Sequence, residues 1–238
     1  MRSIGNDIIA LAETDKDRTS RYRFYSRILS PGELSLYDRL AGLPFPLDRP
    51  AGAGLSFSTF VWLLWSIKES VYKYVSRSDP RLVFSPLKIP VSGLTMRKDY
   101  YEGTISYGGQ FLFSRSFLRD EVIMSIAGGG GDFSLIRWGV REISGSDYAT
   151  QSAGVRKFAL GSLSTVFPGA ALRIVKAPDG PPEIRDGGRS LDIPISLAHH
   201  GRYVAWSYRL PENSSLYRKS AANYKPSERS CIALVPFN

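Results

Sequence analysis

The spacing of apolar residues in the first half of the chain predicts strands around one long helix. Residues 3–11 alternate with the period of a β-strand, and residues 58–76 repeat at the three-and-four spacing of a helix. Short polar helices are predicted over 17–29 and 33–41, and residues 44–57, rich in Pro and Gly, predict a loop. Further strands are predicted at 87–92, 101–106, 109–116 and 121–127.

The second half repeats this plan after a run of glycines at 128–131, which predicts a flexible junction. A strand at 133–140 and a helix at about 150–166 precede predicted strands at 171–176, 182–186, 192–198 and 202–208. Because strand, helix and antiparallel strands occur twice, we expect an α+β fold of two similar halves. Each half would pack a long helix on an antiparallel sheet, and the halves would form a pseudo-dimer. The expected parts are 1–131, 132–210 and a polar tail, 211–238.

Composition narrows the class of protein. The 238 residues are 43% hydrophobic, which is enough for a core. Cys231 is the single cysteine, and with two histidines the chain is too poor in ligands for a typical zinc site. Asp7 interrupts the stretch that a signal peptide would need apolar, and no run reaches the ~18 apolar residues of a membrane span. We therefore expect a cytoplasmic protein with no membrane partner.

The net charge of +9 indicates an anionic partner. Nucleic acid, a phosphate-rich cofactor and an acidic protein all fit this charge. Residues 21–25, Arg-Tyr-Arg-Phe-Tyr, would suit a nucleic-acid-binding module, because such modules interleave basic and aromatic side chains. That alternative explains neither Asp7 nor Glu69.

An acidic residue falls on an apolar face of the first predicted strand. Alternation places Asp7 on the same face as Gly5, Ile9 and Leu11. A carboxylate there is costly unless it is paired, hydrogen-bonded or bound to a metal. A loop-capping acid or a partner of an arginine would satisfy this position as well as a metal ligand.

The long helix carries two stripes of side chains. Its core stripe consists of Phe60, Leu63, Leu64, Ile67, Val71 and Tyr74. The second stripe holds Trp62, Trp65, Glu69, Tyr72 and Lys73. Glu69 and Lys73 are spaced i,i+4, as in an ordinary surface ion pair, but two tryptophans beside them indicate more than a solvated face.

A third group of polar residues ends a strand near the C-terminus. His199 and His200 are followed by Gly201 and Arg202 before the next strand starts. A hairpin end that presents imidazole, guanidinium and backbone N–H groups could bind phosphate. Two polar turn histidines with no ligand are the simpler alternative.

Together these pieces resemble one family. Residues 5–8, 65–73, 180–182 and 196–199 are similar to the Gly-x-Asp-Ile, Trp-Ser-x-Lys-Glu-Ser/Ala-x-x-Lys, Gly-Lys-Pro and Ser-x-Ser-His motifs of the 4′-phosphopantetheinyl transferase superfamily. Their order is that of the holo-acyl-carrier-protein-synthase type. The length and the two halves resemble the surfactin-synthetase-activating type, and the whole layout resembles a longer bacterial subgroup.

The resemblance implies a Mg²⁺-dependent enzyme that moves 4′-phosphopantetheine from coenzyme A to a serine of an apo acyl or peptidyl carrier protein, releasing 3′,5′-ADP. Such carriers serve fatty acid or secondary metabolite biosynthesis. Asp7 and Glu69 would be the Mg²⁺ ligands, as suits a hard cation that also binds substrate phosphate. Lys73 would contact the phosphates, and Glu69 or a water would accept the serine proton.

Coenzyme A binding is implied for a second set of residues. His199 resembles the family histidine that contacts coenzyme A phosphates, with Lys68, Lys73, Arg202 and Ser196 as further binding residues. The carrier would be acidic, and Arg18, Arg21, Arg23 and Arg27 offer it a basic surface. We expect no nucleic-acid partner on this interpretation.

Two positions depart from the family pattern. Ile9 stands where surfactin-type members have a second acid, so water would complete the metal shell. Pro181 replaces the turn lysine, so a phosphate contact would come from Lys176 or Arg185. The second departure leaves open a catalytically degenerate paralogue that binds coenzyme A or a carrier protein without transfer.

Overall fold

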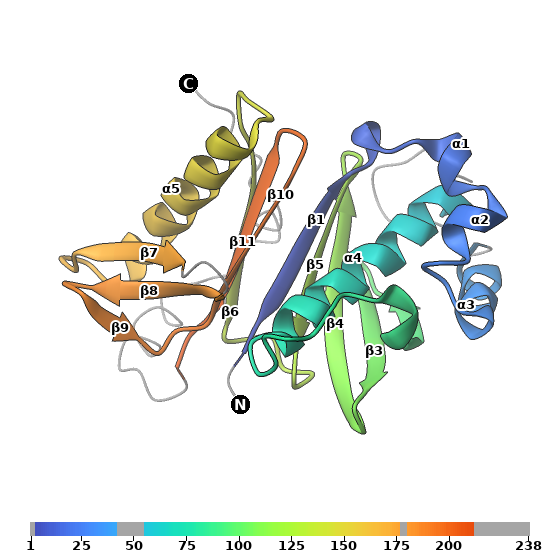
Figure 1. The fold of residues 1–238 in the computed structure, drawn as a ribbon, viewed down its shortest axis with the longest axis horizontal. Helices are drawn as coiled ribbons and strands as arrows, with labels where there is room; N and C mark the ends of the chain where they lie inside the picture. The colour runs from blue at the N-terminus through green and yellow to red at the C-terminus, as the bar shows by residue number, and fades with distance from the viewer. Residues whose placement is uncertain (1–2, 42–54, 177–179, 212–238) are drawn as a thin grey trace.

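The computed structural model describes residues 3–41, 55–176 and 180–211, which fold into α+β structure as predicted (Figure 1). The predicted polar tail, apart from Pro211, and most of the predicted 44–57 loop lie outside the described residues. Within the described ranges, no helix combines the length and the apolar character needed to cross a membrane.

The N-terminal half is a five-stranded antiparallel sheet with the order β1-β5-β4-β3-β2. Its strands are β1 (Gly5–Ala10), β2 (Val91–Met96), β3 (Tyr101–Tyr107), β4 (Gln110–Arg119) and β5 (Val122–Gly128). The helix α4 (Phe57–Val75) crosses one face of this sheet. The shorter elements are η1 (Leu11–Glu13), α1 (Lys16–Thr19), α2 (Tyr22–Tyr25), α3 (Pro31–Ala41) and η2 (Pro86–Lys88).

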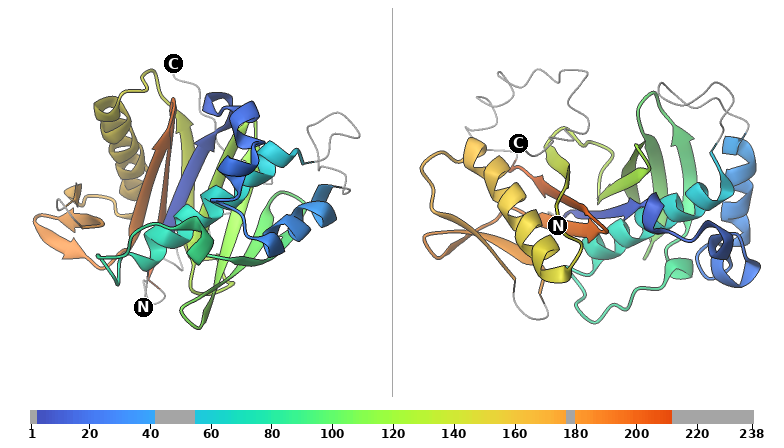
Figure 2. Two further views of the ribbon diagram at one scale, coloured as in Figure 1. Left: turned by 45° about the vertical axis from the view of Figure 1, so that its right-hand side comes forward. Right: turned by 90° about the horizontal axis from the view of Figure 1, so that it is seen from above.

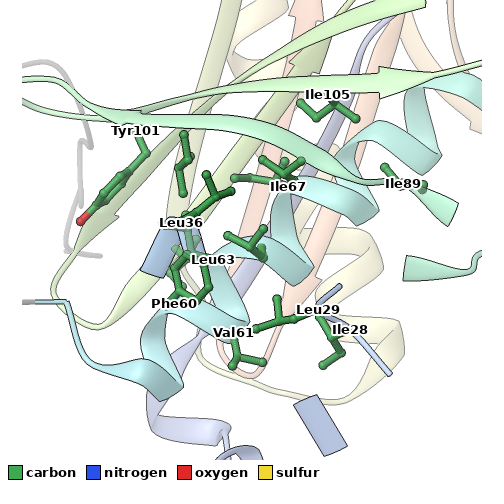
Figure 3. Close-up of a cluster of buried hydrophobic side chains, with 14 of the residues drawn as sticks. Ile28, Leu29, Leu36, Phe60, Val61, Leu63, Ile67, Ile89, Tyr101 and Ile105 are labelled. Atoms are coloured by element: carbon green, nitrogen blue, oxygen red, sulfur yellow. The ribbon is translucent and has the colours of Figure 1, made fainter. Parts of the chain in front are cut away.

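Helix α4 buries the stripe that its sequence predicts. Ser56 caps its first turn by accepting a hydrogen bond from the Thr59 N–H at 3.2 Å. Figure 3 shows Phe60, Leu63 and Ile67 in the core between helix and sheet. Leu64 and Val71 are also fully buried, whereas Tyr74 is only half-buried at the edge of the core.

The C-terminal half begins with β6 (Ile136–Glu142) and the helix α5 (Tyr148–Val166), which Asp147 caps. Five strands follow: β7 (Leu172–Lys176), β8 (Pro182–Asp186), β9 (Arg189–Leu191), β10 (Ile195–His200) and β11 (Tyr203–Arg209). β10 and β11 form an antiparallel sheet with β6, in the order β10-β11-β6. The strands β7, β8 and β9 form a separate antiparallel sheet in that order. In each half the first strand pairs with the last, β1 with β5 and β6 with β11.

The two halves meet along β1, β10 and β11 (Figure 2). A third apolar cluster fills this junction, and it includes Ile8 of β1 and Ile4, which directly precedes β1. The Asn6 N–H donates to Ser196 Oγ at 3.0 Å, and the Ala10 N–H donates to His200 Nδ1 at 2.8 Å. Side chains of β10 thus satisfy amides on the edge of β1 that faces away from β5.

Several predicted elements differ in detail from the structure. The single helix predicted over 17–29 is wrong, because Arg21 has an extended backbone and separates α1 from α2. The strand β9 was not predicted, and the strand expected from residue 192 begins at Ile195. Part of the predicted glycine junction is ordered strand, since Gly128 is the buried last residue of β5.

Candidate active site

A close contact between β1 and α4 brings the first acidic residue to the helix. A Cβ atom on Gly5 would lie 1.9 Å from the Ser70 carbonyl oxygen, so a larger residue would push the strand and helix apart. Asp7 follows two residues later on the same face of β1. The strand motif therefore needs its glycine in order to place its aspartate against α4.

Asp7, Glu69 and Lys73 form one cluster. Lys73 Nζ lies 3.1 Å from Asp7 Oδ1 and 3.3 Å from Glu69 Oε1. Trp65 donates its indole N–H to Glu69 Oε2 at 3.0 Å, which fixes the other oxygen of that carboxylate. Asp7 is buried, while the side chains of Glu69 and Lys73 are 28% and 27% exposed. The cluster is thus open to solvent on the helix side.

The electrostatics of the cluster follow from burial and from its mixed charges. Burial raises the pKa of Asp7, Lys73 lowers it and Glu69 raises it again, so that the net shift is upward. The two carboxylates outweigh burial at Lys73 and raise the pKa of its ammonium. Asp7 Oδ2 is buried and has no hydrogen-bond partner among the described residues, although the nearby Ser66 hydroxyl lowers the pKa of Asp7. That oxygen is available to a ligand.

The second half of the chain brings His199 toward the cluster. Burial lowers the pKa of His199, and the positive charge of Lys73 lowers it further, while Glu69 opposes them. Lys176 makes a smaller contribution in the same direction as Lys73. Tyr148, whose side chain is 70% exposed, lies edge-on to the imidazole with the ring centres 5.7 Å apart. Sequence reasoning missed Tyr148, because no motif marks it.

The other predicted coenzyme A contacts lie apart from this cluster or are engaged elsewhere. Ser196 is buried and accepts the Asn6 N–H at the junction between the halves. Arg202 is exposed at the β10–β11 turn and pairs with Glu142 at 2.8 Å. Arg185, one candidate to replace the turn lysine, pairs with Glu183 on its own strand.

Lys68 is the predicted site residue that the structure separates most clearly from the cluster. Its side chain is fully buried, with Nζ 2.8 Å from Glu33 Oε2 and 2.6 Å from the Ile28 carbonyl oxygen. Burial lowers the pKa of Lys68, and Glu33 partly offsets that shift. Five residues along a helix correspond to a rotation of roughly 140°, so Lys68 and Lys73 lie on different faces of α4. These contacts favour a structural role for Lys68.

The donor set suits a hard cation that also binds substrate oxygen. The described residues contain no group of three or more His, Cys, Asp or Glu side chains that could hold a metal. Asp7 and Glu69 do meet around one ammonium, and Asp7 Oδ2 has no hydrogen-bond partner in the described part of the chain. Mg²⁺ commonly binds one or two carboxylates and completes its shell with water and phosphate, so these residues fit it.

The comparisons with known proteins agree with the motifs. Residues 3–100 match the model of the 4′-phosphopantetheinyl transferase superfamily, a family of transferases. The chain therefore carries the sequence pattern of this superfamily over residues 3–100, as the resemblance predicted. The match includes Asp7, Glu69 and Lys73 and ends before His199. A comparison with curated proteins found no match.

Proposed function

We propose that the protein transfers 4′-phosphopantetheine from coenzyme A to a serine of an apo acyl or peptidyl carrier protein and releases 3′,5′-ADP. The observation that carries this proposal is the cluster in which Lys73 lies 3.1 Å from Asp7 and 3.3 Å from Glu69. Two carboxylates and a lysine, beside a histidine from the other half, suit chemistry at a pyrophosphate. The family match supports the same reaction class.

The carboxylates of Asp7 and Glu69 would hold Mg²⁺. The ion would supply positive charge that offsets the charge of the pyrophosphate. The buried Asp7 Oδ2, which accepts no hydrogen bond from the described residues, supports this role, as does the exposed edge of Glu69. Trp65 would keep the Glu69 carboxylate in place through its indole hydrogen bond.

The transfer step would use residues of both halves. The serine oxygen forms a bond to the β-phosphorus as the bond from that phosphorus to the oxygen of 3′,5′-ADP breaks. Glu69 accepts the serine proton, directly or through a water. Lys73 donates hydrogen bonds to the phosphate oxygens, which orients them and stabilises their charge.

Phosphate binding by the C-terminal half centres on His199. Its imidazole lies within the electrostatic reach of Lys73 and Glu69, and Lys176 adds a second positive charge. Arg202 would join by leaving its exposed pair with Glu142. Ser196 would support the strand from within the junction, and the buried contacts of Lys68 exclude it from this list.

A pseudo-dimeric arrangement would explain why the site needs both halves. The first strand pairs with the last in each half, and a long helix follows the first strand in each. In this proposal the N-terminal half, up to residue 131, supplies the carboxylates and the C-terminal half, up to residue 210, supplies the histidine. The acidic carrier would approach the N-terminal half at Arg18, Arg21, Arg23 and Arg27, which are exposed.

The decisive experiment incubates the protein with coenzyme A, Mg²⁺ and a panel of apo carrier proteins. We expect the mass of phosphopantetheine to be added to at least one carrier. A carrier with its target serine changed to alanine is the matched control, and chelation of the metal should stop the reaction. Coenzyme A binding without transfer to any carrier would indicate a degenerate paralogue. Salt-sensitive binding of nucleic acid without coenzyme A binding would indicate the nucleic-acid alternative.

A further inference from the structure

One arginine just beyond α4 contacts both halves of the molecule. Arg77 lies two residues after the last residue of α4, and its side chain is half-buried. Its Nε donates to the Ile4 carbonyl oxygen at 3.2 Å, and its Nη2 donates to the Ile195 carbonyl oxygen. Ile4 directly precedes β1, and Ile195 is the first residue of β10. A single guanidinium thus joins the end of α4 to the starts of two strands.

These three elements carry the candidate active site. Helix α4 carries Glu69 and Lys73, β1 carries Asp7, and β10 carries His199. Ile4 lies three residues before Asp7, and Ile195 lies four residues before His199. At a strand rise of ~3.3 Å per residue, each carbonyl is on the order of 10 Å from its site residue along a regular strand. A shift at Arg77 would therefore be transmitted to the site.

The surroundings of Arg77 are costly for a charge. Burial lowers the pKa of Arg77 to about 10, and it is the sole cause of that shift. The hydrogen bonds of Arg77 to the described residues go to main-chain carbonyl oxygens. Among these residues no carboxylate offsets the free-energy cost of desolvating the guanidinium. A planar guanidinium can reach two carbonyls on different strands at once, which an apolar side chain or an ammonium does less well.

Other hydrogen bonds across the junction do not involve α4. The Asn6 N–H donates to Ser196 and the Ala10 N–H donates to His200, so both join β1 to β10. The Arg77 Nη2 hydrogen bond to the Ile195 carbonyl oxygen joins the α4 end of the chain to β10 directly. Arg77 thus adds a direct link between the end of the helix and the histidine strand, beside their shared packing on β1.

We infer that Arg77 is a positioning residue, which holds β10 against α4 and β1 so that His199 of one half meets Asp7, Glu69 and Lys73 of the other. The inference concerns how the site is assembled, and its catalytic consequence rests on the proposed function. Arg77 itself touches no reacting group in this arrangement.

Amide exchange in the ligand-free protein tests the alignment without any assumption about substrate. In Arg77→Gln, the Asn6 and Ala10 amides should exchange about 10-fold faster, because β10 loosens from β1, while amides within β3 and β4 change less than about 2-fold. Lys68→Met is the matched control, since it removes a buried cation from α4 that makes no contact with β10. It should not accelerate Asn6 and Ala10 selectively. If Arg77→Gln fails to fold, Arg77→Lys keeps the charge and should show the same selective effect in part.

A double-mutant cycle tests the functional consequence through the dissociation constant of coenzyme A. Arg77→Gln should weaken binding about 10-fold in the otherwise native protein but less than about 2-fold in a His199→Ala background, because both changes remove the same contact. Additive losses, or amide exchange that rises uniformly, would overturn the positioning role. A native protein that binds no coenzyme A would overturn the proposed function, and the exchange experiment would still decide the role of Arg77.

Discussion

Two lysine–carboxylate pairs lie on different faces of α4, and they differ in exposure and in how fully they are hydrogen-bonded. Lys68 and Glu33 are 2.8 Å apart and almost completely buried. Lys73 lies 3.3 Å from Glu69 and 3.1 Å from Asp7, and the Lys73 and Glu69 side chains are each more than a quarter exposed. Adjacent residues of one motif, Lys68 and Glu69, thus belong to different networks.

The buried network is complete. Glu33 Oε2 accepts from Lys68 and from the Ser30 N–H at 2.7 Å, while Glu33 Oε1 accepts from the Val91 N–H at 2.8 Å. The Glu33 side chain thereby joins α3 to α4 and to β2. The cluster around Lys73 leaves Asp7 Oδ2 without a hydrogen-bond partner among the described residues. A satisfied buried network stabilises one structure, whereas an unsatisfied buried oxygen next to solvent has capacity for a ligand.

The largest expected effect is on catalysis and concerns the cluster around Lys73. Asp7→Asn and Glu69→Gln should each reduce kcat for carrier modification by at least about 10-fold, because each removes a charged ligand without changing shape. Turnover would be measured by the mass of the carrier. Thermal unfolding should show that both variants stay folded.

The control for this prediction is Glu102→Gln, which makes the same chemical change at a partly exposed carboxylate paired with Arg97. It should leave kcat unchanged. If Asp7→Asn and Glu69→Gln both retained more than about a tenth of the native kcat, the assignment of the metal ligands would be wrong.

The next effect is on the free energy of unfolding and concerns the buried pair of Lys68 and Glu33. Lys68→Met should lower the free energy of unfolding by about 3 kcal/mol, because it leaves the Glu33 carboxylate buried without its counter-charge. Denaturant unfolding would measure this loss. Lys68→Met with Glu33→Gln should be less destabilised, since the double change removes the buried charge as well, although the single amide oxygen of Gln replaces two acceptor oxygens and leaves the Ser30 or the Val91 N–H without its acceptor. A large rise in KM for coenzyme A in Lys68→Met, with stability unchanged, would instead restore Lys68 to the binding site.

Much of this contrast could be predicted from the sequence, though not all. The i,i+4 spacing of Glu69 and Lys73 predicts their contact, and strand alternation predicts that Asp7 faces the apolar side. Ser30 and Glu33 have the spacing of a capping box, which indicates the start of α3. The same pattern does not indicate that Glu33 also accepts a hydrogen bond from Lys68, because that contact depends on how α3 packs against α4.

Contacts between the halves could not be predicted from the sequence either, because they also depend on how the elements pack. Arg77 follows the long helix without any motif, and its acceptors are the backbone carbonyls of Ile4 and Ile195, which carry no side-chain signal. The split of the second meander into two sheets also escaped prediction. Alternation marks β8 and β10 as strands but does not say which neighbours they pair with.

A smaller effect concerns the basic residues of α1 and α2. These helices are separate, and the Arg18 guanidinium lies over the Phe24 ring at 5.1 Å, while Arg21 and Arg23 are exposed. Exposed charges mainly steer association and are screened beyond ~8 Å at physiological salt. Raising the ionic strength should therefore increase KM for the carrier several-fold with little change in kcat, and Arg23→Glu should do the same at low salt.

The matched control for this surface is Arg189→Glu on β9, which makes an equal charge change in the C-terminal half. It should leave KM for the carrier nearly unchanged at low salt. A KM that is flat across ionic strengths and indifferent to Arg23→Glu would mean that the carrier docks elsewhere.

The smallest expected effect concerns His200, whose hydrogen bond depends on its protonation state. His200 Nδ1 accepts the Ala10 N–H at 2.8 Å, which requires that this nitrogen carry no proton. Burial lowers the pKa of His200, with Glu13 and Glu69 opposing the shift. As the pH falls below the unfolded value of about 6.5, the unfolded chain takes up a proton that the folded protein resists, so stability decreases.

Measurement of unfolding free energy at pH 7.5 and 5.5 would test this dependence. Because His200 is only partly buried, the loss attributable to it should be below about 1 kcal/mol. His200→Gln supplies a neutral acceptor for the Ala10 N–H and does not titrate, so the variant should lose less stability than the native protein over this range. His199 is present in both proteins, but the positive charge of His200 helps to lower the pKa of His199, so the comparison is made in a His199→Gln background that removes this second titration. Equal losses in the two proteins would show that the stability of the junction does not depend on the protonation state of His200.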